Sequence, residues 1–109
     1  MLILPIKKKW FDMIISGEKK EEYREIKPYW TKRFYNELND LIIVRDNNEE
    51  LSYIKYATGT VTFKNGYQKD APKIKCFIEL NKGYGKREWG AEPNKEYYIL
   101  EILSVEKEW

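Results

Sequence analysis

The sequence predicts an α+β fold, in which five or six short strands curl into a small sheet or barrel and two N-terminal helices pack against it. Two observations predict this class. Helical spacing of apolar residues occurs only in the first 40 residues, and strand-like runs dominate from residue 41 onward. The length of 109 residues is typical of one domain, so we expect residues 1–109 to form a single domain.

The two helices are expected near the start of the chain. After an apolar strand at residues 2–6, Lys7–Ser16 has the apolar spacing of a helix, and Gly17 can end it because glycine tolerates positive φ. Pro28 suits the first turn of the second helix. Trp10 and Trp30 lie on the apolar stripes of these helices, and we expect both in the core.

A charged segment, Lys20–Ile26, separates the two helices. It lies between Gly17 and Pro28, so we expect it to be extended rather than helical. In an extended chain, Glu22 and Arg24 share a face and can contact each other. Such a pair is costly to bury without partners, so it suits the mouth of a cleft that takes a polar ligand. The alternative is a solvated turn of helix, because Lys, Glu and Arg are good helix formers.

Strands are expected over most of the remaining chain. The run at Lys73–Leu80 alternates cleanly and places Ile74, Cys76, Ile78 and Leu80 toward the core. Asn65-Gly66 is a strong turn signal. The other expected strands are residues 41–45, 56–63 and 97–105, with a long loop at residues 81–95.

The composition excludes several classes of protein. Hydrophobic residues make up 42% and aromatic residues 16%, which argues against disorder. There is no histidine, which excludes Ser-His-Asp and Cys-His catalysis, and no cofactor or metal site is expected. A single cysteine, Cys76, excludes an internal disulfide and indicates a reducing, cytoplasmic location without a disulfide-linked partner. No apolar run is long enough for a membrane span.

The charge is unevenly distributed. Residues 1–35 contain nine Lys or Arg and five Asp or Glu, a net +4, whereas residues 36–109 contain eleven and thirteen, a net −2. The total of +2 does not by itself indicate nucleic acid, and a solvated surface of mixed charge is the simpler interpretation. Lys7–Lys9 begin the first expected helix, where positive side chains repel the positive end of the helix dipole. A bound anion would offset this repulsion. Three solvated lysines are the alternative.

Four further residues are candidates for contact with a ligand. Lys64 and Tyr67 flank the expected turn at Asn65-Gly66 and could form the rim of a cleft, although ordinary hairpin chemistry also explains them. In the loop at residues 81–95, Arg87 offers a charge for phosphate and Trp89 a ring for base stacking. The alternative is that Trp89 closes one end of the barrel.

The spacing G-x-K-x-x-E-x-R, carried here by Gly17, Lys19, Glu22 and Arg24, resembles the signature of the ASCH domain, a family of the PUA-like superfamily of small β-barrels. The segments LPIKKKWFDMI, GEKKEEYREIKPYW, FKNGY and EWG extend the resemblance over essentially the whole chain. It implies a PUA-like barrel that binds RNA or a nucleotide in a cleft beside the first helix. Lys19 and Arg24 would meet phosphate or a base edge, and Glu22 would accept from an amino or hydroxyl group.

Two alternatives remain open. Some proteins of similar fold are amidohydrolases that act on acylated cytidine, and others are similar to ribonucleases. In the amidohydrolases a threonine nucleophile takes the place of Glu22, so Lys19 and Glu22 would be catalytic here only in a different reaction. A carboxylate can act as a base, and cations can stabilise developing charge. The other alternative is a protein-interaction module whose charged cleft binds an acidic segment.

Overall fold

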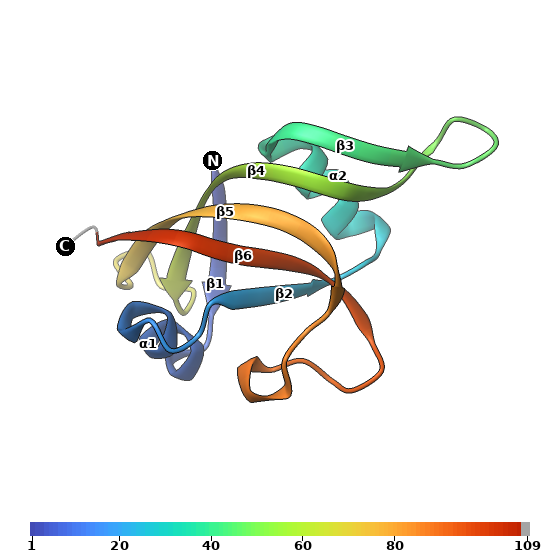
Figure 1. Ribbon diagram of the computed structural model, residues 1–109. Helices are drawn as coiled ribbons and strands as arrows, with labels where there is room; N and C mark the ends of the chain where they lie inside the picture. The colour runs from blue at the N-terminus through green and yellow to red at the C-terminus, as the bar shows by residue number, and fades with distance from the viewer. Residues whose placement is uncertain (108–109) are drawn as a thin grey trace.

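The computed structural model describes residues 1–107 of the chain. These residues contain six strands, two α-helices and one 3₁₀ helix (Figure 1). In chain order these are β1 (Leu2–Ile6), α1 (Lys8–Ser16), β2 (Glu21–Glu25), α2 (Pro28–Glu37), β3 (Asn39–Arg45), β4 (Leu51–Asn65), β5 (Lys73–Tyr84), the 3₁₀ helix η1 (Arg87–Trp89) and β6 (Glu96–Lys107). The α+β class is as predicted. The helices do not precede the sheet, however, because α1 lies between β1 and β2, and α2 between β2 and β3.

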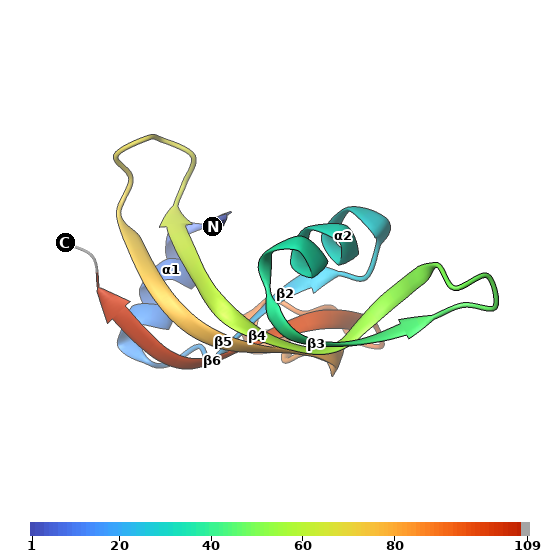
Figure 2. The same ribbon diagram turned by 90° about the horizontal axis from the view of Figure 1, so that it is seen from above.

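The strands form one mixed sheet that curls into a half-barrel (Figure 2). Its order is β1-β4-β5-β6-β2, and β3 pairs with β4 as well. The pair β1–β4 is parallel, and every other pair is antiparallel. The β3–β4 hairpin projects from the curl as an arm (Figures 1 and 2).

The three central strands are longer than the short strands expected. β4 has 15 residues, and β5 and β6 have 12 each. β4 begins at Leu51 because its first residues pair with β3, and β5 continues to Tyr84 because its end pairs with the start of β6. The residues at these ends are charged or include glycine and do not alternate, so the sequence does not predict strands there. They pair nevertheless, because a ladder of backbone hydrogen bonds does not depend on side-chain alternation.

One apolar core joins the sheet and both helices. The four residues expected to face inward from β5, namely Ile74, Cys76, Ile78 and Leu80, are fully buried, which confirms the alternation. From α2, Phe34 is fully buried and packs edge-on against Tyr98, with ring centroids 5.5 Å apart. Burial raises the pKa of the Cys76 thiol to about 12, so this side chain stays neutral at physiological pH. Within residues 1–107, no helix is long and apolar enough to cross a membrane.

Candidate functional site

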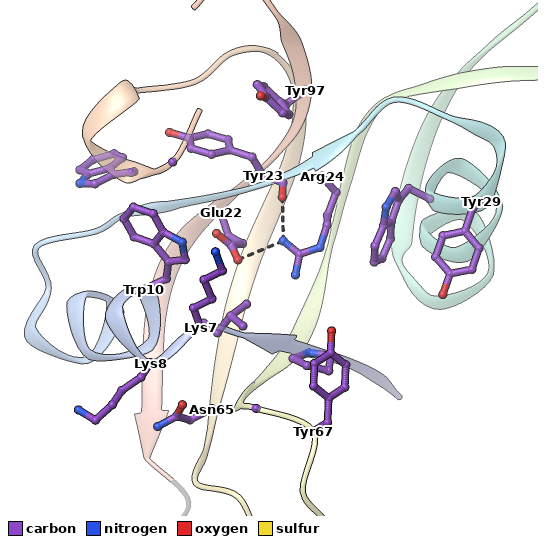
Figure 3. Close-up of a pocket in the computed structure, with 16 residues that line it drawn as sticks. Lys7, Lys8, Trp10, Glu22, Tyr23, Arg24, Tyr29, Asn65, Tyr67 and Tyr97 are labelled. Carbon is purple, nitrogen blue, oxygen red and sulfur yellow. Dashed lines mark hydrogen bonds and ion pairs between the residues drawn. The ribbon is translucent and has the colours of Figure 1, made fainter. Parts of the chain in front are cut away.

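A cavity of about 760 Å³ lies where β2, the starts of both helices and the β4–β5 turn meet (Figure 3). Its walls combine aromatic rings with a few charged groups. The lining residues are Pro5, Ile6, Lys7, Lys8, Trp10, Glu22, Tyr23, Arg24, Tyr29, Trp30, Asn65, Gly66, Tyr67, Trp89, Gly90 and Tyr97. Only one of them, Glu22, carries a negative charge. The cavity therefore suits a ligand that is both flat and anionic.

The strand β2 brings the motif residues to this cavity. Gly17 ends α1 in the left-handed conformation, at φ 84°, and donates its backbone N–H to the Ile14 carbonyl at 3.2 Å. The chain then runs extended and pairs with β6. This confirms the predicted extended segment. Glu22 and Arg24 also contact each other as expected, with Arg24 Nη1 3.0 Å from Glu22 Oε2 (Figure 3).

Three charged side chains form a cluster at the floor of the cavity. Glu22 lies between two cations: its Oε1 is 3.1 Å from Lys19 Nζ, and its Oε2 accepts from Arg24. The side chains of Lys19, Glu22 and Arg24 are 0%, 7% and 16% exposed. Two cations and one anion leave this buried cluster with a formal charge of +1. Because an uncompensated buried charge is costly, an anionic ligand would complete the cluster.

Lys19 lies beneath the lining of the cavity rather than in it. Its Nζ donates to the Trp89 carbonyl and lies 4.6 Å and 5.1 Å from the ring centroids of Trp10 and Tyr23. Burial lowers the pKa of Lys19, and the positive charge of Arg24 lowers it further, whereas Glu22 opposes both effects. The resemblance implied that Lys19 enters the cleft. The structure places it one layer deeper, where it holds Glu22 and the loop that carries Trp89.

Of the two cations in the cluster, Arg24 is the one that lines the cavity. Its guanidinium lies over the Trp30 ring, 5.2 Å from the centroid, in a cation–π contact. Nη1 donates to Glu22 and, at 2.7 Å, to the Tyr23 carbonyl. Among residues 1–107, Nη2 and Nε have no hydrogen-bond partner, so both can donate to a ligand. Trp30 and Glu22 fix the plane in which they do so.

Aromatic side chains flank the charged cluster on two sides. On one side, Tyr29 meets Trp30 edge-on, with centroids 4.9 Å apart, at the start of α2. Trp10 lies by the other cation, Lys19, and Trp89 packs against the cluster of Tyr23 and Tyr97. Tyr67 stands at the β4–β5 turn with 88% of its surface exposed. Figure 3 shows Lys7 directed from the start of α1 toward Glu22 and Arg24, whereas Lys8 points away.

Tyr23 positions the loop that carries Trp89. The Tyr23 hydroxyl accepts from the Lys86 backbone N–H at 2.8 Å and donates to Glu21 Oε1 at 2.7 Å. Burial raises the pKa of Tyr23 well above its usual range, so the hydroxyl keeps its proton. At Gly85 the backbone passes so close to the Tyr23 ring that a Cβ would lie 2.5 Å from Cε1.

We predict that Gly85→Ala lowers the free energy of unfolding by about 1–3 kcal/mol, because the new methyl group overlaps a ring whose hydroxyl is fixed by two hydrogen bonds. Gly83→Ala is the matched control. Its Cβ would lie 3.4 Å from Ile99 Cδ1, an ordinary contact, and should change stability by less than about 1 kcal/mol. Urea unfolding of both variants measures the difference. Equal effects of the two substitutions would contradict the close approach at Gly85.

The structure brings together some of the residues singled out from the sequence. Glu22, Arg24, Tyr67 and Trp89 line the cavity, and Lys19 supports it from below. Lys64 and Arg87 lie outside the lining. Arg87 begins η1 and is exposed, while the backbone of the same short helix turns Trp89 toward Lys19.

Several lining residues were not predicted. Trp10 and Trp30 were expected in the core; they pack against it only in part, and they also line the cavity. A helical stripe cannot separate these two roles, because its edge faces both the core and the cavity. Tyr29 and Tyr97 gave no signal in the sequence. For Lys7, the sequence indicates only a possible anion site at the start of the first helix.

Comparisons with known proteins do not add to this description. A scan against protein-family models found no match, and searches of curated proteins and of solved structures found none either. Within residues 1–107, no group of three or more Cys, Asp or Glu side chains is placed to hold a metal ion. Function is therefore inferred from the cavity and the motif.

Proposed function

We propose that the protein binds RNA or a nucleotide in this cavity, as an ASCH domain of the PUA-like superfamily. One observation carries the proposal: a buried charge cluster of net +1 forms the floor of a cavity with aromatic walls. A nucleotide has the two matching properties, a flat base and an anionic phosphate. Aromatic rings and guanidinium planes stack on bases, and arginine binds phosphate through its planar fork of donors.

Arg24 and Lys7 are the groups suited to the phosphate. Arg24 has Nη2 and Nε free and is held by Glu22, and Lys7 points toward the same place (Figure 3). The start of α1 adds to this attraction. It has no side-chain cap and no acidic residue in its first turn, so its N–H groups carry positive dipole charge toward an anion.

Glu22 supports binding better than hydrolysis. Both of its carboxylate oxygens are already in ion pairs, one with Lys19 and one with Arg24. This arrangement suits a residue that orients Arg24 toward the ligand. A general base needs an oxygen that is open to the proton it removes.

Isothermal titration with AMP, adenosine and inorganic phosphate tests the proposal. We expect AMP to bind more tightly than either fragment, because only AMP engages the rings and the cations together. Removal of a charged hydrogen bond costs about 1.5–3 kcal/mol, so adenosine should bind about 10- to 150-fold more weakly than AMP. If adenosine and AMP bind equally, or AMP does not bind at all, the proposed function is wrong.

The same titration repeated from pH 7.5 to 10.5 tests the part played by Lys19. Its lowered pKa means that it loses its proton below its usual value of 10.5, which takes the cluster from +1 to zero. The affinity for AMP should therefore fall as the pH rises through this lowered pKa. Lys19 contributes to folding stability in the opposite direction, since its lowered pKa means that the unfolded chain keeps this proton to a higher pH than the folded protein does. Cys76 and Tyr23, whose pKa values burial raises, lower the stability as the pH rises. The contribution of Lys19 is therefore the difference between the wild type and Lys19→Met, and the fall in affinity should be absent from Lys19→Met.

A further inference from the structure

The two faces of the curled sheet have different surroundings. Both α-helices lie on the inner face (Figure 2), where Phe11 of α1 and Phe34 of α2 share one core with Ile78 of β5. The loop before β6 covers one end of the outer face, where it packs on Tyr23 and Tyr97. Neither helix packs on the rest of the outer face, so this part of the sheet is open to a partner.

A row of three glutamates crosses the outer face. Glu79 in β5 is directly opposite Glu101 in β6, and Glu101 is directly opposite Glu21 in β2. The Tyr23 hydroxyl donates to Glu21, but among residues 1–107 none of the three carboxylates is in an ion pair. Like charges in directly opposed positions destabilise a sheet. This acidic row would therefore be stabilised by cations from outside the chain.

A pair of lysines lies on the same face, further along the strands. Lys73 in β5 is directly opposite Lys64 in β4, and in the described part of the chain neither has an ion-pair partner. Lys73 is six residues (79 − 73) from Glu79 on β5, which corresponds to about 20 Å along a strand. The Debye length at physiological salt is about 8 Å, so this lysine pair and the acidic row hardly offset each other within one chain.

An uncharged band separates the acidic row from the lysine pair. Its centre is Phe77, which is 45% exposed. Its neighbours in register are Thr60 of β4 and Ser104 of β6, both exposed. The next outward residue of β5, Lys75, lies opposite Glu106 and adds no net charge. A face with a negative end, an apolar middle and a positive end is complementary to itself after a rotation of 180°.

We infer that two copies of the protein form a symmetric dimer through the outer faces of their sheets. A two-fold axis that runs across the strands beside Phe77 brings the lysine pair of each copy opposite the acidic row of the other. The curl makes the outer face convex (Figure 2), which confines the contact to its middle. The interface is therefore small, below about 1,200 Å² in total, and the dimer is weak and reversible.

The dimer leaves both cavities open. Glu22 and Arg24 are in register with the buried Leu100 and Tyr98, so their side chains point to the inner face of the sheet. Nucleotide binding and dimerisation thus use opposite faces, and this inference does not depend on the proposed function.

Charge reversal tests the arrangement. Lys64→Glu/Lys73→Glu makes both ends of the face negative, and Glu79→Lys/Glu101→Lys makes both ends positive. Sedimentation equilibrium from about 10 µM to 1 mM protein, at about 50 mM salt, measures the dissociation constant of each. Either variant alone should dimerise at least about 10-fold more weakly than the wild type, because like charges then meet. An equimolar mixture of the two variants should restore the dimer, since each then meets the opposite charge.

Two controls separate this interface from general effects of charge and apolar surface. Lys9→Glu/Lys32→Glu changes the net charge as much as Lys64→Glu/Lys73→Glu does, but on exposed positions of α1 and α2, and should leave the dimer intact. Phe77→Ala should weaken the dimer about 10-fold, whereas Tyr35→Ala, which removes a ring that is 39% exposed on α2, should not. Circular dichroism checks that every variant is folded.

A wild type that remains monomeric over the whole concentration range would overturn the inference, and so would a mixture of the two charge variants that fails to dimerise. A dimer that persists in each charge variant alone would place the interface on another surface. Titration with AMP is read separately: its failure would remove the proposed function and leave the dimer standing.

Discussion

Glu22→Ala should lower the free energy of unfolding by about 3–5 kcal/mol, because it leaves two cations side by side in a buried place. Lys19 has no exposed side-chain surface and cannot move its charge into water. Arg24 remains partly hydrated, since its side chain is 16% exposed and lines the cavity. The loss should shrink as the pH rises, because Lys19 can then release its proton. Urea unfolding at pH 7 and at pH 10 measures both effects.

A double-mutant cycle separates charge repulsion from simple loss of packing. Lys19→Met alone should cost about 1–3 kcal/mol, since it leaves the Trp89 carbonyl without its donor. Combined with Glu22→Ala, however, it removes one of the two unpaired cations. The double variant should therefore be more stable than Glu22→Ala alone. If the two losses simply add, the cluster is not held by its charges.

Arg24→Ala should abolish most nucleotide binding while the fold persists. Truncation of one member of a buried, ligand-facing charge pair costs about 2–5 kcal/mol, which corresponds to about a 30- to 5,000-fold loss of affinity. The remaining pair of Lys19 and Glu22 is neutral, so the stability should fall less than in Glu22→Ala. Titration with AMP and urea unfolding of the same preparation give both numbers.

Arg33→Ala is the matched control for Arg24. Arg33 also lies against Trp30, 5.6 Å from the ring centroid, but it donates to the Ile3 carbonyl and does not line the cavity. Arg33→Ala removes the same charge as Arg24→Ala, near the same ring, and should leave the affinity for AMP unchanged within a few-fold. Arg24→Lys keeps the charge without the planar fork and should recover only part of the binding. Equal losses in Arg24→Ala and Arg33→Ala would contradict a specific contact of Arg24 with the ligand.

Local patterns were enough to predict the frame of the site. β2 lies between Gly17 and Pro28, which prevent a continuous helix there. Strand geometry alone then places Glu22 and Arg24 on one face. The alternation in β5 identified its inward residues for the same reason: the period of a strand does not depend on its neighbours.

The depth of the site could not be predicted in this way. Lys19 and Lys20 are adjacent and chemically identical, yet one is buried and the other is exposed. The difference arises because the Trp89 carbonyl, 70 residues further along the chain, lies against Lys19. The same holds for the aromatic walls, which meet only when the helices, the β4–β5 turn and the loop before β6 are in place. Such contacts are set by topology, and one sequence does not reveal them.

The pairing of β2 with β6 determines when the site can form during folding. Glu21 lies opposite Glu101, so 80 residues separate them (101 − 21). The edge strand β1 likewise can pair only after residues 61–65 of β4 are available. Contacts between residues so far apart in sequence carry a large entropic cost of loop closure and slow the folding of a small domain. On the ribosome, Glu22 and Arg24 are made before β6 and take their places only after β6 has emerged. A chain that lacks β6 therefore has the motif without the cavity.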